Sequence, residues 1–122
     1  MSQEVFKLKW HKFKSTISSS FSELRKNGDF CDVILACEDQ KIVAHKAILS
    51  SCSPFFHAIL KMNAHPQPLI YMKDMKMDLL EAVINFMYHG EVNIDQDKLN
   101  SIFEVGTELK VKGLCQAEMS PD

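Results

Sequence analysis

The chain has 122 residues, of which 46% are apolar and 25% are charged, a composition typical of one soluble globular domain that buries its own core. No apolar run approaches the roughly 20 residues that a membrane span requires, and lysines interrupt the apolar residues near the start, so the sequence predicts neither a membrane contact nor a signal peptide. The net charge is −2, and the sequence contains no recognised nucleic-acid reader motif and no clustered basic-aromatic face.

The charge is unevenly distributed. Residues 1–28 carry six basic and two acidic side chains, a balance of +4, and the remaining residues carry eight basic and fourteen acidic ones, a balance of −6. The lysines of this basic arm alternate with large apolar residues, which is typical of the solvated face of a structured element. We therefore expect the arm to dock on an acidic body, its own or a partner's, and expect no direct contact with nucleic acid.

The first expected element is a strand at Val5–Trp10, because apolar residues alternate there with Lys7 and Lys9. No second strand follows nearby, so its pairing partner is distant in this chain or lies in another chain. A helix is expected over 11–27, ended by Gly28, a residue that adopts the left-handed conformation at helix ends. One apolar stripe runs along this helix and contains Trp10, Phe13, Ile17, Phe21 and Leu24.

The middle of the chain reads as a buried strand, a hairpin, a second strand and two short helices. Phe30–Cys37 is apolar on both faces, which predicts a central strand. The chain returns as a strand at Ile42–Ala44 and becomes helical up to Cys52. Ser53 and Pro54 are expected to cap and open a second helix, and a short strand is expected at Leu69–Met72.

The last third predicts helices with one short strand between them. A helix is expected at Asp78–Tyr88, followed by the alternating segment Glu91–Ile94. Asp95 is placed to cap the final helix, which is expected to continue to Lys112 and Gly113. Residues 115–122 look like the start of a linker.

Residues that commonly carry chemistry form no recognisable site in the sequence. There is no glycine-rich phosphate loop, nucleophile elbow or paired zinc-ligand pattern, and the five histidines and four cysteines lack zinc-like spacing. The sequence therefore predicts no enzyme, no metal and no cofactor, with free cysteine thiols. A metal- or thiol-dependent enzyme is the competing hypothesis.

Asp32 is the single charge inside the apolar strand. A carboxylate in such a place is costly unless it is paired, and the hairpin can return Lys46 beside it. Lys46 is the favoured partner, and Arg25 and Lys26 are the alternatives. A solvent-exposed Asp at the strand edge, or a local cap of the backbone near Gly28, is the structural alternative to a charged pocket at an interface.

Several separated motifs resemble those of one family. FCDVILAC, VAHKAILSSCSPFF, FMYHGEVNI and ELKVKGL occur in the order found in the BTB/POZ domain. The leading FKLKW, followed by the helix at 13–24, resembles the Tramtrack-type subgroup of insect transcription factors. The similarity spans about residues 5–114, so we expect a BTB/POZ domain at 1–114 with an N-terminal strand and helix, and a linker from 115.

The resemblance implies an α+β fold in which small β-sheets flank a cluster of helices. It further implies a homodimer in which the N-terminal strand pairs with the partner's strand near 92–94, and it places Asp32 and Lys46 in a charged pocket. The residues expected at the dimer interface are Phe6, Leu8, Trp10, Phe13, Ile17, Phe21, Val92 and Ile94.

The expected function is that of a protein–protein interaction domain of a nuclear transcription regulator. Its partners are expected to be a second copy of itself, in dimers or higher oligomers, and other BTB domains or co-regulators. The competing hypothesis is a substrate adaptor for a Cullin-3 ubiquitin ligase. The loop at 62–68 lacks the hydrophobic-x-Glu element associated with Cullin-3 binding, which counts against that hypothesis.

Overall fold

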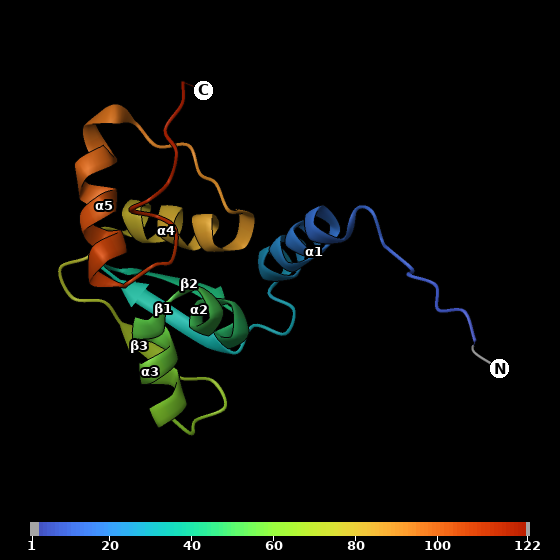
Figure 1. Cartoon of the computed structure of the whole chain (residues 1–122). Helices are drawn as coiled ribbons and strands as arrows, with labels where there is room; N and C mark the ends of the chain where they lie inside the picture. Colours follow the sequence, from blue (N-terminus) through green and yellow to red (C-terminus); the bar gives the residue numbers. More distant parts are fainter. Residues whose placement is uncertain (1–2, 122) are drawn as a thin grey trace.

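The computed structural model describes residues 3–121 and shows helices grouped around a small mixed sheet (Figure 1). The helices and strands, in chain order, are α1 (Phe13–Asn27), β1 (Val33–Cys37), β2 (Gln40–Ala44), α2 (Lys46–Cys52), α3 (Pro54–Met62), β3 (Leu69–Tyr71), α4 (Met77–His89), the short 3-10 helix η1 (Gln96–Lys98) and α5 (Leu99–Glu108). This is the α+β architecture that the resemblance implies.

The sheet has the strand order β2-β1-β3, with β1 antiparallel to β2 and parallel to β3. The central place of β1 confirms the prediction from its apolar residues on both faces. The strand is shorter than expected and begins at Val33. Phe30 lies outside it because its φ of 59° places the backbone in the left-handed region, which interrupts an extended run.

The core lies between the sheet and the helices that follow it. Seven residues of α4 are buried, so this helix is the central one of the helical layer. The largest side chains with almost no exposed surface include Leu35, Leu49, Phe56, Leu80, Ile84 and Ile102. They come from the sheet, α2, α3, α4 and α5, so one core joins these elements into a single unit.

Local capping chemistry explains where several helices begin and end. The Ser53 hydroxyl accepts the Phe56 N–H at 3.1 Å, and Pro54 occupies the first turn of α3, as the sequence predicts. Gly28 ends α1 with a φ of 75°, which confirms the predicted stop signal. α1 itself begins at Phe13, two residues later than expected at 11.

The final helix differs from its prediction at both ends. The Asp95 side chain accepts no capping hydrogen bond, because η1 comes first and Lys98 occupies the position before α5. The helix ends at Glu108 and not at Lys112, because Lys110 has a φ of 53° and turns the chain. The turn brings Val111 and Leu114 into the core, where both are buried. Burial of these two side chains compensates for ending the helix early.

Neither of the two outer strands expected from the sequence forms within this chain. Residues 3–10 have no regular secondary structure and extend away from the body in Figure 1, and residues 91–95 also form no strand. A strand requires a neighbour for its N–H and C=O groups, and within the described chain these segments have none. The expected exchange concerns two chains and stays a prediction.

Candidate self-association surface

An apolar surface is exposed along the N-terminal arm and the start of α1. The side chains of Phe6, Leu8 and Trp10 are 78%, 95% and 56% exposed, and Phe13 and Ile17 are exposed as well. The Trp10 and Phe13 rings contact each other edge to face with centroids 5.3 Å apart. Monomeric proteins rarely expose a contiguous apolar surface of this kind, so it indicates an interaction site.

Helix α1 is attached to α4 by its polar side. The Ser18 hydroxyl donates a hydrogen bond to the Tyr88 carbonyl oxygen at 2.8 Å, and the Arg25 guanidinium donates to the Asn85 side chain. The guanidinium also lies 5.0 Å from the centre of the Tyr88 ring. These contacts hold the helix in place while its Phe13 and Ile17 side remains open.

Phe21 differs from the other residues expected at the interface. It is half-buried, packs against the core of its own chain and meets the His45 ring edge to face at 5.8 Å. The apolar stripe of α1 therefore divides into two parts. Phe13 and Ile17 are available to a partner, whereas Phe21 anchors α1 to the body.

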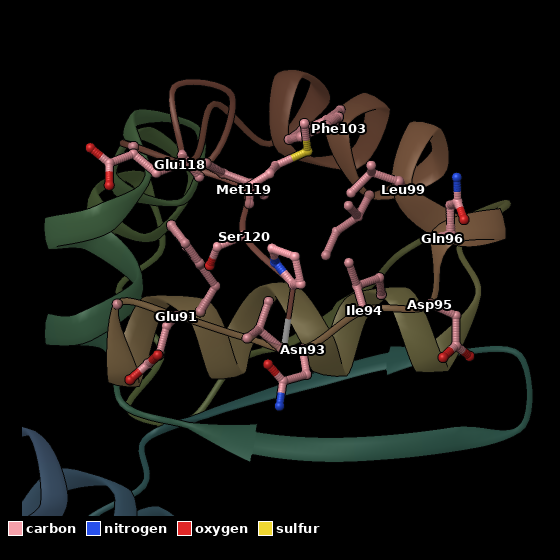
Figure 2. A pocket seen from close by; sticks show the side chains of 18 residues that line it. Glu91, Asn93, Ile94, Asp95, Gln96, Leu99, Phe103, Glu118, Met119 and Ser120 are labelled. Carbon is pink, nitrogen blue, oxygen red and sulfur yellow. The ribbon is translucent and has the colours of Figure 1, made fainter.

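A groove of about 1210 Å³ lies on the opposite part of the molecule, between residues 90–96, α5 and the tail at 117–121. Figure 2 shows its labelled side chains, with Leu99 and Phe103 on one wall and Met119 beside them. Val92 and Ile94 lie in this groove and are half-buried against the core. Acidic side chains at its rim are Glu91, Asp95 and Glu118.

Asp32 and Lys46 meet, but not through the side-chain ion pair that the sequence suggested. The Asp32 carboxylate accepts the main-chain N–H of Lys46 at 2.7 Å, at the first residue of α2. The Lys46 ammonium instead donates to the His65 carbonyl oxygen at 3.0 Å near the surface. Arg25, the alternative partner, contacts Asn85. Asp32 thus satisfies an N–H group that the helix leaves without an intrahelical acceptor.

Sequence reasoning missed a buried polar cluster around His45. Tyr88 accepts the His45 main-chain N–H at 2.9 Å, and its hydroxyl lies 2.6 Å from Nδ1 of the same residue. The other ring nitrogen lies 3.0 Å from the Asp29 carbonyl oxygen and 3.7 Å from Sγ of Cys31. Burial raises the pKa of Tyr88 to about 12. Both residues looked like helix-end residues in the sequence, where nothing indicated their contact.

Three of the four cysteines do not have the surroundings of reactive thiols. Burial raises the pKa of Cys31, Cys37 and Cys52, which keeps each thiol protonated and weakly nucleophilic. Among residues 3–121, no group of three or more His, Cys, Asp or Glu side chains converges on a metal position. In the same residues, no helix combines the length and apolar character needed to cross a membrane.

Helices around a small mixed sheet, an exposed apolar arm and an open groove are features of a protein-interaction module. The chain belongs to the BTB/POZ domain family, because the model of that domain matches residues 21–119.

Known proteins similar to the chain include fly proteins of very different length. It is 44% identical over 119 residues to the Drosophila melanogaster Longitudinals lacking protein-like, covering 98% of this chain and 94% of that protein. It is 35% identical to the alpha isoform of Drosophila melanogaster tramtrack over 95% of this chain, but it spans only 14% of tramtrack. The BTB domain of zebrafish PATZ1 has the same fold, with a TM-score of 0.82, 19% identity and 92% of each chain covered.

Proposed function

We propose that this domain joins two copies of its chain by exchange of their N-terminal arms. The segment around Phe6 and Leu8 of each copy adds a strand to residues 92–94 of the other. The observation that carries the proposal is that both segments lack a strand partner within one chain, while the arm exposes its apolar side chains. An exchange satisfies the main chain of both segments in a symmetric dimer.

Charge supports this choice of partner segment. Lys7 and Lys9 alternate with the apolar residues of the arm, and Glu91 and Asp95 flank the segment that it would join. A strand laid in the groove brings the two sets of opposite charge together. Opposite charges across paired strands stabilise the pairing, and complementary surfaces also accelerate association.

The remaining expected interface residues have a place in the same arrangement. Trp10, Phe13 and Ile17 lie on the open side of the arm and α1, where a second α1 can cover them. We place Asp32 and Lys46 in a charged pocket that faces the partner copy, with the carboxylate already oriented by the start of α2. Apolar burial at about 25 cal/mol per Å² provides most of the stabilisation of such an interface.

The whole protein is a nuclear transcription regulator in this proposal, and the domain also recruits other BTB domains or co-regulators. The resemblance of the arm and α1 to the Tramtrack-type subgroup supports it, together with the identity to tramtrack. The Cullin-3 adaptor hypothesis is not favoured by any contact in the described chain, and the loop at 62–68 lacks the expected recognition element.

Light scattering coupled to gel filtration tests the exchange. We expect the wild-type chain to have the mass of two or more copies. Deletion of residues 1–10, and separately Leu8→Asp, should give a single-chain mass or an insoluble protein, because the apolar surface then lacks its partner. Gln40→Asp, which adds the same charge on the exposed side of β2, should leave the mass unchanged.

Two results would contradict the proposal. One is a wild-type chain that remains a single copy at every concentration. The other is a Leu8→Asp variant as large and as thermally stable as the wild type. Leu8 is 95% exposed, so its replacement costs a lone chain almost no packing energy, and a lower mass reports on association.

A further inference from the structure

The outer edge of β3 carries main-chain groups that have no partner in the described chain. The Ile34 N–H donates to the Pro68 carbonyl, and the Met72 N–H donates to the Ala36 carbonyl. In the register of the parallel pair, the main-chain N–H and C=O groups of Ile70 therefore point toward β1. Those of Leu69 and Tyr71 point outward, away from the sheet. Figure 1 shows β3 at the border of the sheet.

The side chains at this edge are apolar and open. Leu69 is 50% exposed and Tyr71 is 59% exposed, and both lie on the same face of the strand. Ile70 points the other way and packs against the core. The segment 66–72 contains no Lys, Arg, Asp or Glu. An uncharged edge with unpaired N–H and C=O groups is a template for pairing with another strand.

The opposite edge of the sheet is protected in the usual way. β2 places Gln40 and Lys41 at the surface, and a lysine on an edge strand discourages pairing with a further chain. The two prolines near β3 do not protect it. Pro68 is turned toward β1, and Pro66 precedes the strand, so both outward N–H groups are retained.

We propose that β3 pairs antiparallel with β3 of a second copy, with Leu69 opposite Tyr71 of the neighbouring copy. The arrangement is self-complementary, as a twofold interface requires: each Leu69 meets a Tyr71, and each exchanges both main-chain hydrogen bonds with its counterpart. The paired strands are limited to Leu69–Tyr71 and carry no charged side chain, so no like charges face each other between them. An aromatic residue opposite an aliphatic one is a favourable cross-strand pair.

The β3 contact uses a different surface from the arm exchange. Its consequence, the joining of dimers into larger assemblies, rests on the proposed function, because the arms form those dimers. A strand of three residues makes a weak contact by itself. A dimer formed through the arms presents a β3 edge on each copy, so edge pairing joins dimers into larger assemblies. Linkage of weak sites within one particle raises the effective affinity of each.

Sedimentation velocity of the full chain over a range of concentrations tests the pairing. We expect the wild type to form species larger than two copies. Leu69→Lys alone and Tyr71→Glu alone should remove the larger species and leave the two-copy mass. The twofold contact has two halves, each a Leu69 facing a Tyr71 of the other copy, so either substitution places an unpaired charge in both halves. The matched control Gln40→Lys, at the protected edge, should keep them.

A mixture of the two variants tests the register. Leu69→Lys in one copy then faces Tyr71→Glu in its neighbour, while the other half of the contact keeps Tyr71 opposite Leu69. The larger species should return in an equal mixture. If either variant alone keeps the larger species, if the mixture does not restore them, or if the wild type never exceeds two copies, the pairing of β3 is wrong.

The two proposals fail in different ways. Failure of the arm exchange appears as a two-copy mass that survives Leu8→Asp, whatever the β3 variants do. Failure of β3 pairing leaves the two-copy mass dependent on Leu8 and indifferent to Leu69 and Tyr71. A two-copy wild type reduced to one copy by Leu69→Lys would assign the dimer itself to β3.

Discussion

Asp32 stabilises the start of α2 through the main chain of Lys46, and its negative charge lies at the end of the helix where N–H groups point outward. We expect Asp32→Ala to lower the free energy of unfolding by about 1–2 kcal/mol, the typical cost of losing a helix cap. Lys46→Met keeps the main-chain N–H and should cost no more than about 0.5 kcal/mol. Urea unfolding at one fixed protein concentration measures both. The opposite ranking would show that the charge pair, and not the cap, is the stabilising contact.

Tyr88 should make stability depend on pH in the alkaline range. Its pKa rises from 10.0 to about 12 because burial disfavours the phenolate. A raised pKa in the folded state gives stability that is complete below pH 10 and is lost as the pH rises toward 12. We expect the unfolding free energy of the wild type to fall more steeply over that interval than that of Tyr88→Phe. A Tyr71→Phe background leaves Tyr88 as the only tyrosine, so its absorbance titration reports the pKa directly.

The residue-level chemistry was partly predictable. The sequence brings Asp32 and Lys46 together through the hairpin, and the structure places them in contact. It does not indicate which atoms meet, because that depends on where α2 begins relative to β1. The contact between His45 and Tyr88 could not be predicted from the sequence. These residues are far apart in the chain, and each resembles an ordinary residue at a helix end.

Gly106 controls how α5 packs on the end of the domain. A Cβ at this position would lie 2.6 Å from Cδ2 and 3.0 Å from Cγ of Leu114, which is buried. Gly106→Ala should therefore lower the free energy of unfolding by about 1 kcal/mol, because overpacking at about 1–3 kcal/mol exceeds the helix-propensity gain of about 1 kcal/mol. In a Leu114→Ala background the same substitution should become neutral or stabilising. Additive effects in this double-mutant cycle would show that the two side chains do not collide.

At the scale of elements, the helical patterns were more informative than the strand patterns. α4 lies close to its predicted limits because it buries one apolar stripe against the core of its own chain. α1 also lies close to its predicted limits, although it buries no residue fully, because Ser18, Phe21 and Arg25 attach it to the body. The strands expected at 5–10 and 91–94 have no neighbour in the described chain, and their pairing with a second copy stays a prediction. The end of α5 was misplaced because Leu109, Val111 and Leu114 suit a helix as well as the tight turn at Lys110 that actually buries them.

The distribution of charge over the whole molecule gives a further test of the arm exchange. Residues 1–28 have a balance of +4 and the remaining residues −6, and the acidic side chains at the rim of the groove include Glu91 and Asp95. If Lys7 and Lys9 of one copy lie beside these residues of its partner, the double substitution Lys7→Glu with Lys9→Glu should weaken association, because like charges across paired strands destabilise them.

Reversing the other side should restore the contact. We expect the double variant Glu91→Lys with Asp95→Lys to associate weakly alone and to form a mixed species with the Lys7→Glu, Lys9→Glu protein when the two are refolded together. Native mass spectrometry distinguishes the mixed species from either parent if one chain carries a short tag. Added salt should weaken the mixed species only in part, because screening acts on the exposed charges while Phe6, Leu8 and Trp10 keep their apolar contacts. Absence of the mixed species, with both parents folded, would place the arm on another surface.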